Sequence, residues 1–570
     1  MSEQVGIQTN KTDNISPGIH SPAIHPRSGG RILAEALRIH GTDRIFCVPG
    51  ESYIDVLNAL YDMPDIQLIV AKHEGAAANM AEADGKLTGR PGICLVTRGP
   101  GAAHASIGVH TAFQDSTPMI LFIGQVQRSH RGREAFQEVE FRQMFAPLAK
   151  WVAEVDNPAR IPEYVLHAFQ CATSGRPGPV VLSLPEDVLS EICSVEDASC
   201  FHAVQAAPKL CDIDAFRSEL DRSQRPLLIL GGSGWSEDAC AAVKLFVEAN
   251  GLPVVTSFRR QDLIDNEHPC YAGHLSLGLP PHLVNRVNSA DLLIALGTRL
   301  GDVSTRGYTV PKPPRISQRL VHVHADPSEL GRVYQADLSI NAGPSFFAAT
   351  LGALAPFSDP PWRSWTNEAR QDYLKFTAIP SARPQSGVDL AAVVSHLAKR
   401  LPPDATVSNG AGNYTIWVHR FFKYKRPRTE LAPTSGAMGY GFPAAIAAKL
   451  RFPKRLSICF AGDGCFLMYP QELATAVQYD AAVIVIVVNN GMYGTIRMHQ
   501  ERLFPGRVSG TDLRTPDFVA LAQSFGAYAE RIESTDAFPE AFERAIEARR
   551  PAVLELCVDR NQITPDRRLP

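Results

Sequence analysis

Acidic and amide side chains follow two apolar runs in the last third of the chain. The run at 456–464 ends in the letters GDG, the run at 481–490 ends in NN, and 24 residues separate the two motifs. Neighbouring parallel strands end at the same edge of a sheet, so Asp463 and Asn490 are expected side by side. A carboxylate and an amide oxygen are hard ligands that suit Mg²⁺, which shares its coordination shell with phosphate groups. The spacing therefore predicts a magnesium site that binds a diphosphate.

Another acid, Glu74, follows the apolar stretch LIVAK (68–72) and begins a run of Gly, Ala and Asn residues. Taken alone, it is an acid at the start of a helix, where the helix dipole favours it by about 0.3 to 1 kcal/mol. The neighbouring side chains are too small to cover a carboxylate. The residue types leave two interpretations, a helix-terminal acid or an acid that meets a ligand.

Three blocks of short apolar strands, alternating with helical stretches, must position these residues. The expected strands lie within 44–48, 66–71, 92–97, 119–124 and 179–185, then 226–234, 252–258, 291–302 and 320–327, and finally 405–410, 456–464, 481–490 and 551–559. Continuous apolar strands separated by helices indicate parallel sheets that are covered on both faces. We therefore predict an α/β fold with three doubly wound parallel-sheet domains.

The places where the alternation of strands and helices is interrupted predict the domain boundaries. They give a disordered leader at 1–27 and domains at 28–195, 205–355 and 380–560. Ser28 is a suitable N-cap for the first helix. The segments LILGGSG and LGTRLGD fit a dinucleotide-type turn, and we expect the central domain to be Rossmann-like. The proline-rich segment at 355–365 is predicted to be a linker.

Bulk composition argues against several classes of function. The chain has 570 residues, a formal net charge of -3 and 45% hydrophobic residues, so it favours neither nucleic acid nor a membrane surface as a partner. No apolar run approaches the roughly 20 residues that span a bilayer, and the first 26 residues lack the apolar core of a signal peptide. Eleven cysteines without a CxxC pair are typical of a cytoplasmic enzyme. We expect small-molecule substrates and self-association.

The GDG and NN pair resembles the thiamine diphosphate motif of the family that contains acetolactate synthase, benzoylformate decarboxylase and pyruvate decarboxylase. The resemblance extends over about residues 28–560. It implies that Asp463, the Asn490 side chain and the Met492 carbonyl bind Mg²⁺ and, through it, the diphosphate.

Two further segments look like parts of the cofactor site in this family. In TSGAMGYGFPAA (434–445), the resemblance implies that Met438 props the cofactor into a V shape and that the Gly436 carbonyl meets its aminopyrimidine amine. NGAGNYTIW (409–417) is similar to the turn beside that ring, around Ala411. The implied cofactor-binding residues are Glu74, Ala411, Gly436, Met438, Gly462, Asp463, Gly464, Asn490 and Met492. Domain 28–195 would bind the aminopyrimidine, and domain 380–560 the diphosphate.

The resemblance also implies a catalytic role for Glu74. The family glutamate hydrogen-bonds the aminopyrimidine N1′ and promotes the imino tautomer, which takes the proton from thiazolium C2; such a role suits a carboxylate in a poorly hydrated pocket. In the family, the domains that carry Glu74 and Asp463 meet across a subunit boundary. The resemblance therefore implies a homodimer or a homotetramer.

The loop GQVQRSHRGREAFQEVEF (124–141) favours the carboligase branch of the family. It has a single histidine, His130, where pyruvate decarboxylases have a pair, and its AFQE run, with Phe136 and Gln137, is similar to acetolactate synthases. The implied reaction is decarboxylation of a 2-keto acid, followed by addition of the resulting enamine to a second carbonyl. The alternative is a non-ligating decarboxylase that releases an aldehyde.

Two positions depart from acetolactate synthases. Glu51 stands where the synthases have a glycine that faces the reacting carbon, and His499 stands near the position of a pocket tryptophan. Glu51 is interpreted as a helix-terminal acid, as a proton donor to the enamine, or as a contact to a polar or cationic substrate. His499 is interpreted as a solvated lid residue or a pocket residue. With Phe136 and Gln137, these two residues are the candidate substrate pocket.

The resemblance leaves FAD open, because acetolactate synthases bind FAD in the middle domain and other members do not. Arg259, Arg260 and Arg299 are expected either to meet a phosphate or to be solvated. A non-catalytic flavin- or nucleotide-binding protein is a rival interpretation, and an NAD dehydrogenase is a weaker one, because no complete GxGxxG with a downstream acid occurs. The joint presence of Glu74, Met438, Asp463 and Asn490 argues against the non-catalytic binding protein.

Overall fold

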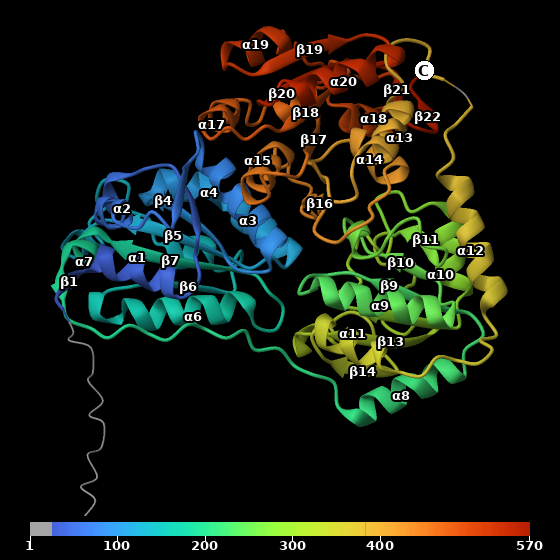
Figure 1. Ribbon diagram of the computed structural model, residues 1–570, viewed down its shortest axis with the longest axis horizontal. Helices are drawn as coiled ribbons and strands as arrows, with labels where there is room; N and C mark the ends of the chain where they lie inside the picture. The colour runs from blue at the N-terminus through green and yellow to red at the C-terminus, as the bar shows by residue number, and fades with distance from the viewer. Residues whose placement is uncertain (1–24, 382) are drawn as a thin grey trace, which may run out of the picture.

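Three six-stranded sheets organise the chain, which a computed structural model describes over residues 25–381 and 383–570 (Figure 1). Their strand orders are β3-β2-β4-β5-β7-β6, β11-β10-β9-β12-β13-β14 and β16-β15-β17-β18-β20-β19. The strand pairs within the three sheets run parallel. The predicted α/β fold with three doubly wound sheets is confirmed.

The strands have the following bounds. The first sheet contains β2 (Arg44–Cys47), β3 (Gln67–Val70), β4 (Gly92–Thr97), β5 (Met119–Gln125), β6 (Trp151–Glu154) and β7 (Pro179–Pro185). The second contains β9 (Pro226–Leu230), β10 (Val254–Thr256), β11 (Tyr271–His274), β12 (Leu292–Leu296), β13 (Arg319–His324) and β14 (Leu338–Asn341). The third contains β15 (Thr406–Asn409), β16 (Glu430–Leu431), β17 (Ser457–Gly462), β18 (Ile484–Asn489), β19 (Tyr528–Ile532) and β20 (Ala552–Cys557).

The helices that cover the sheets follow the same blocks. The first has α1 (Gly29–Ile39), α2 (Ile54–Tyr61), α3 (Glu74–Thr88), α4 (Arg98–Asp115), α5 (Phe141–Phe145), α6 (Ile161–Thr173) and α7 (Glu186–Ser190). The second has α8 (Leu210–Asp221), α9 (Glu237–Asn250), α10 (Pro281–Ser289), α11 (Pro344–Gly352) and α12 (Arg363–Phe376). The third has α13 (Leu390–Arg400), α14 (Tyr414–Phe421), α15 (Gly441–Arg451), α16 (Asp463–Phe466), α17 (Glu472–Gln478), α18 (Gly494–Leu503), α19 (Phe518–Ser524) and α20 (Phe538–Glu547).

Strand order separates the central sheet from the other two. The central sheet has the 3-2-1-4-5-6 order of dinucleotide-binding folds. The first and third sheets share a different order, with the first strand between the second and the third. In both kinds of sheet, ligands bind where the winding reverses, at the carboxyl ends of the strands. Ligand-binding sites are therefore expected at three such edges, one in each sheet.

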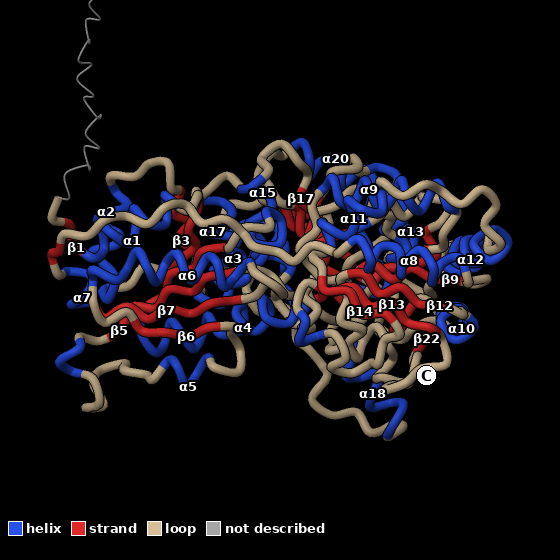
Figure 2. Tube along the Cα trace, turned by 90° about the horizontal axis from the view of Figure 1, so that it is seen from below, coloured by secondary structure: helices blue, strands red, loops and turns tan. Residues whose placement is uncertain are grey.

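Both faces of the first sheet are covered by helices, as the side view in Figure 2 shows. Apolar residues of α1, α2 and α6 form one buried cluster with alternate residues of the strands. Residues of α3 and α4 form another, which also includes residues of α15. The first and third blocks of one chain therefore share a hydrophobic core.

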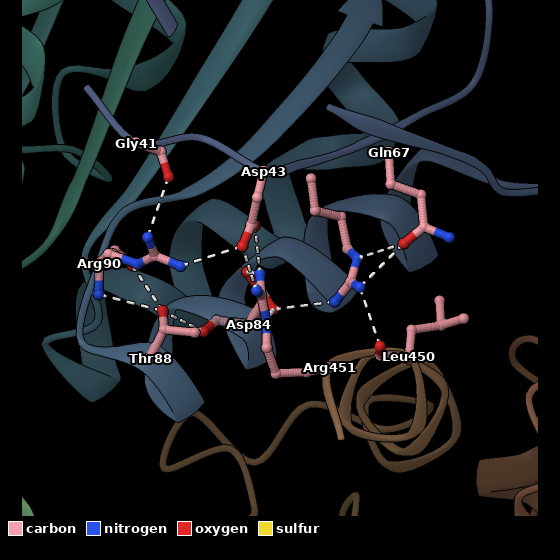
Figure 3. A network of polar contacts seen from close by, with 9 residues as sticks. Gly41, Asp43, Gln67, Asp84, Thr88, Arg90, Leu450 and Arg451 are labelled. Carbon is pink, nitrogen blue, oxygen red and sulfur yellow. Dashed lines mark hydrogen bonds and ion pairs between the residues drawn. The ribbon is translucent and has the colours of Figure 1, made fainter. Parts of the chain in front are cut away.

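Polar contacts at the ends of α3 and α15 fasten the same two blocks together (Figure 3). The Arg451 guanidinium donates to both Asp84 carboxylate oxygens at 2.8 Å and to Asp43 at 2.7 and 2.9 Å. Arg44 donates to the Leu450 carbonyl at 2.9 Å. Because Arg451 is partly buried and paired with two carboxylates, this contact fixes the orientation of the blocks better than an exposed ion pair would.

Two predictions at the chain connections need correction. The sequence predicts a disordered leader at 1–27. Residues 1–24 lie outside the described part, but Arg27 and Ser28 form β1 (Arg27–Ser28), which pairs with β8 (Ile192–Cys193). The linker was placed at 355–365, but α12 begins at Arg363. Ser28 does cap α1, as predicted. Among the described residues, no helix is both long and apolar enough to cross a bilayer.

Candidate active site

The GDG and NN motifs meet at the carboxyl edge of the third sheet. Strands β17 and β18 are neighbours, with Gly462 opposite Val488. Asp463 begins α16, and its two carboxylate oxygens accept the N–H groups of Gly464 and Gly491, each at 2.8 Å. The predicted juxtaposition of Asp463 with the end of the neighbouring strand is therefore confirmed.

A cavity of 260 Å³ opens beside these motifs. Its walls include every residue of the third block that the sequence singles out for the cofactor: Ala411, Gly436, Met438, Gly462, Asp463, Gly464, Asn490 and Met492. These residues come from four separate stretches of sequence, which the sheet edge brings together. A preformed cavity with a few convergent polar groups has the character of a small-molecule site.

The polar groups of this cavity suit a hard cation. Asp463, Asn490 and Met492 offer a carboxylate, a side-chain amide and a backbone carbonyl, which is the donor set that Mg²⁺ prefers. Burial raises the pKa of Asp463, and hydrogen bonds from backbone N–H groups partly oppose that shift. A divalent cation would offset the cost of a buried carboxylate. The residues present therefore fit a magnesium ion that carries a diphosphate.

Gly464 allows close packing at this edge, because a β-carbon there would lie 2.7 Å from Tyr493 Cε1. Tyr493 lines the cavity, so it would have to move. We expect Gly464→Ala to weaken thiamine diphosphate binding by at least about 10-fold. Displacement of the cavity wall would misplace the groups that bind the ligand. Calorimetric titration measures this. The matched control is Gly352→Ala, where the nearest atom lies at 3.4 Å; equal affinities for the two variants would contradict the expectation.

Glu74 lies at the carboxyl edge of the first sheet and is the first residue of α3, with His73 as the N-cap. Its side chain is 15% exposed, and its Oε2 lies 2.8 Å from His104 Nδ1, within hydrogen-bond distance. A β-carbon at Gly101 would approach Glu74 Oε1 to 3.6 Å. The carboxylate is therefore largely buried, with His104 and Gly101 beside it.

The structure does not bring Glu74 into the cavity at Asp463 within one chain. The described residues that line this cavity all belong to the third block, from Ala411 to Ile496. The ring of His73 contacts Tyr469 of the third block, with ring centroids 5.2 Å apart, but Tyr469 does not line the cavity. A single chain thus presents two separated half-sites.

Glu472 anchors the turn that carries Glu74. Its carboxylate accepts the Lys72 N–H at 3.0 Å and the Thr475 hydroxyl at 2.6 Å. Burial raises the pKa of Glu472 to about 6. This buried acid connects the β3–α3 turn to α17.

The raised pKa of Glu472 predicts how stability depends on pH. The folded protein binds the proton more tightly than the unfolded chain, so stability falls as pH rises from about 4.5 through about 6. Glu472→Gln removes the charge, and at about pH 8 it is expected to be more stable than the native protein by up to ~2 kcal/mol. The gain should vanish below about pH 4.5. Thermal midpoints of both proteins across this range measure it, and a pH-independent difference would refute the assignment.

The four predicted substrate-pocket residues lie outside the cavity at Asp463. Phe136 is 74% exposed, and the Gln137 carbonyl accepts the Gly99 N–H at 3.0 Å. His499 lies on α18, where its Nδ1 meets Arg502 at 3.0 Å. Glu51 begins a 3-10 turn, Glu51–Tyr53, and lies 3.0 Å from Arg98. Within one chain, Phe136, Gln137 and His499 do not lie at a ligand-binding surface.

A second cavity, of 110 Å³, lies at the carboxyl ends of β9 and β12, and residues of the first block complete its walls. Arg260 and Arg299 line it, and they donate to the carbonyls of Asp115 and Gln114 at 2.9 and 2.8 Å. Arg259 does not line it: this buried side chain donates to the Gly410 carbonyl at 2.8 Å and ties the central block to the third. The expectation that Arg259 meets a phosphate or solvent is therefore wrong.

Sequence reasoning missed several groups at the edge of the first sheet. His104 holds Glu74, and Arg98 bridges Glu51 and Glu186. Arg98 and Glu186 directly follow the apolar runs of β4 and β7. Inspecting the residue after each apolar run, the rule that located Asp463, would have found both.

Comparison with known proteins defines the class of this fold and site. The descriptions "Thiamine pyrophosphate enzyme, N-terminal TPP binding domain", "central domain" and "C-terminal TPP binding domain" match residues 27–144, 213–354 and 410–556. The chain belongs to the family of thiamine pyrophosphate-dependent enzymes.

Similar proteins within this family are large subunits of acetolactate synthase. The "Probable acetolactate synthase large subunit" of Methanocaldococcus jannaschii is 31% identical, over 94% of this chain and 93% of the relative. The "Acetolactate synthase large subunit" of Parasynechococcus marenigrum is 33% identical over 96% and 90%, and that of Corynebacterium glutamicum is 31% identical over 94% and 88%.

Proposed function

We propose that the protein is a thiamine diphosphate- and Mg²⁺-dependent carboligase, which removes CO₂ from a 2-keto acid and joins the remaining acyl unit to a second carbonyl. The observation that carries this proposal is the single cavity lined by all the third-block residues expected at a diphosphate–magnesium site. Near full-length similarity to acetolactate synthase large subunits supports ligation over simple decarboxylation.

Six residues of the cavity have a proposed role in binding. Asp463, the Asn490 side chain and the Met492 carbonyl hold the metal. The Gly436 carbonyl and Met438 orient the aminopyrimidine, beside the turn at Ala411. Domains 28–195, 205–355 and 380–560 carry the aminopyrimidine, central and diphosphate-binding parts. When bound, thiamine diphosphate supplies the electron sink for cleavage of the bond next to the carbonyl.

Glu74 is the proposed catalytic residue. It binds the N1′ atom of the aminopyrimidine and moves a proton at that atom. His104 restrains the carboxylate through the contact at 2.8 Å. Gly101, which has no side chain, leaves room beside the carboxylate, where a β-carbon would lie 3.6 Å from Oε1.

We also propose that two copies of the chain complete each site, because Glu74 and the cavity at Asp463 are separate in one chain. Helix α18, beside that cavity, has no buried residue and exposes Ile496 and Leu503. Phe136, in the loop of the predicted substrate pocket, is also exposed. Exposed apolar side chains next to both half-sites are typical of a subunit interface. We propose that the protein is a homodimer or a homotetramer and that it is cytoplasmic.

FAD is a second proposed ligand, for the cavity of the central sheet. Arg176, Arg260 and Arg299 line this cavity, together with the Gly-rich turn after β9, and they suit a diphosphate group. The absorbance spectrum of the purified protein tests it. A spectrum of oxidised flavin supports the proposal, and its absence after incubation with FAD overturns it.

Product analysis tests the proposed reaction. The protein is supplied with thiamine diphosphate, Mg²⁺ and a panel of 2-keto acids, and the products are identified by mass. A hydroxyketone formed by joining two substrates, with release of CO₂, is the expected result. An aldehyde alone, even when an aldehyde acceptor such as glycolaldehyde is added, would establish the decarboxylase alternative, and no turnover of any 2-keto acid would overturn both.

A further inference from the structure

Three charged residues meet at the carboxyl edge of the first sheet. Glu51 follows β2, Arg98 follows β4 and Glu186 follows β7. The Arg98 guanidinium lies 3.0 Å from a carboxylate oxygen of Glu51 and 3.0 Å from one of Glu186. We call these three residues the charged triad. It spans the end of β5, which lies between β4 and β7.

The triad occupies the place where this fold binds ligands. Strand β2 continues to β3 on one side, whereas β4 lies on its other side and continues to β5. The winding therefore reverses between β2 and β4, and ligands bind at such a reversal. Arg98 directly follows β4, and Glu51 lies four residues after the end of β2.

The backbone around Glu51 is fixed by close contacts. A β-carbon at Gly50 would lie 2.3 Å from Thr97 Cβ, and one at Gly124 would lie 2.1 Å from Ser52 Oγ. The hydroxyls of Ser52 and Thr97 lie 2.7 Å apart. Glu51 is thus held against the ends of β4 and β5, unlike an acid on a loosely packed surface turn.

Burial differs sharply within the triad. The Arg98 side chain is 10% exposed and its Nε has no partner in the described structure, whereas the Glu51 side chain is 70% exposed. A buried guanidinium therefore supports a carboxylate that faces outwards. Two carboxylates and one guanidinium leave one net negative charge.

The triad is close to the catalytic carboxylate. Helix α4 begins at Arg98, and its next turns carry Gly101 and His104, which both face Glu74. Glu51 and Glu74 also follow adjacent strands, β2 and β3. A substrate that reacts near Glu74 would therefore meet the outward carboxylate of Glu51.

We propose that Glu51, positioned by Arg98 and Glu186, selects a carbonyl acceptor that carries a hydrogen-bond donor, an ammonium or a hydroxyl group, next to its carbonyl carbon. This inference rests on the proposed carboligase function and specifies its second substrate. A carboxylate held by a guanidinium accepts hydrogen bonds from such groups. The exposed carboxylate of Glu51 repels the carboxylate of a second 2-keto acid at the acceptor position. Glu51 therefore acts as a recognition residue, and its ion pair with Arg98 argues against the alternative role of a proton donor.

The test compares acceptors at constant donor. With pyruvate as the donor, kcat/KM is measured for aminoacetaldehyde, glycolaldehyde, acetaldehyde and a second pyruvate. The native protein is expected to prefer the first two over the last two by about 10-fold or more, because a polar site rejects analogues that leave it unpaired. Glu51→Gln should reduce the preference for aminoacetaldehyde by about 10- to 100-fold, and that for glycolaldehyde less, because an amide oxygen still accepts from a hydroxyl.

The controls separate recognition from damage. Glu163→Gln alters another arginine-paired carboxylate, on the outer surface of α6, and should leave the ratios unchanged. Arg98→Gln should lower the same ratio as Glu51→Gln, and Arg98→Lys should restore part of it. If Glu51→Gln still releases CO₂ from pyruvate and its kcat/KM ratios between acceptors are unchanged, the inference is overturned. Absence of CO₂ release from every 2-keto acid tested with the native protein would instead overturn the proposed function.

Discussion

Replacing Glu74 by glutamine is expected to lower kcat for 2-keto acid turnover by about 10²- to 10⁴-fold. Glutamine keeps the shape of the side chain but cannot exchange a proton with the aminopyrimidine N1′. Its neighbours, His104 at 2.8 Å and the N-cap His73, remain in place, so folding should be unaffected. Steady-state assays of CO₂ release at saturating thiamine diphosphate and Mg²⁺ measure the loss.

The matched control for Glu74→Gln is Glu472→Gln. Glu472 contacts the turn that carries Glu74 but has no proposed role in proton transfer. It should retain kcat within a few-fold. If Glu74→Gln kept full activity, or if both variants lost activity equally, Glu74 would be a helix-terminal acid alone.

Replacing Asp463 by alanine is expected to weaken binding of thiamine diphosphate with Mg²⁺ by at least about 100-fold. Loss of an outer-shell partner already costs 10- to 100-fold in metal sites, and Asp463 is proposed to contact the metal itself. The substitution also frees the N–H groups of Gly464 and Gly491, which Asp463 now satisfies. Isothermal titration with cofactor, with and without Mg²⁺, measures the effect.

Asp404→Ala serves as the control for Asp463, because Asp404 is a partly exposed acid of the same block that pairs with Arg455. Its cofactor affinity should equal that of the native protein. A Mg²⁺-dependent affinity that survives in Asp463→Ala would contradict the proposed metal site.

Most strands of the fold could be predicted because they are buried on both faces. Central strands such as β5 and β18 are continuous apolar runs, and their ends locate the cavity at Asp463. Within the three six-stranded sheets, the strands that the sequence did not reveal are β6, β11, β14, β16 and β19, and each lies at the edge of its sheet. Edge strands have only one neighbour and are short, so no long apolar run marks them.

The candidate site was predictable where it depends on local motifs. Asp463, Asn490 and Met438 lie in short segments whose order along the chain places them at one sheet edge. The charged triad was not predictable in this way, because Arg98 and Glu186 are 88 residues apart and meet only through the strand order. The separation of Glu74 from Asp463 likewise depends on how whole blocks pack.

The central claim is that Glu74 of one copy and Asp463 of another serve the same cofactor. Co-expressing Glu74→Gln and Asp463→Ala chains with different tags, and purifying the mixed dimers, tests it most directly. If the sites lie between copies, one site of each mixed dimer carries both changes and the other is intact, so about half of the native activity should return. If each site lies within one chain, both sites are defective. Mixed dimers as inactive as the two parent variants would contradict the account.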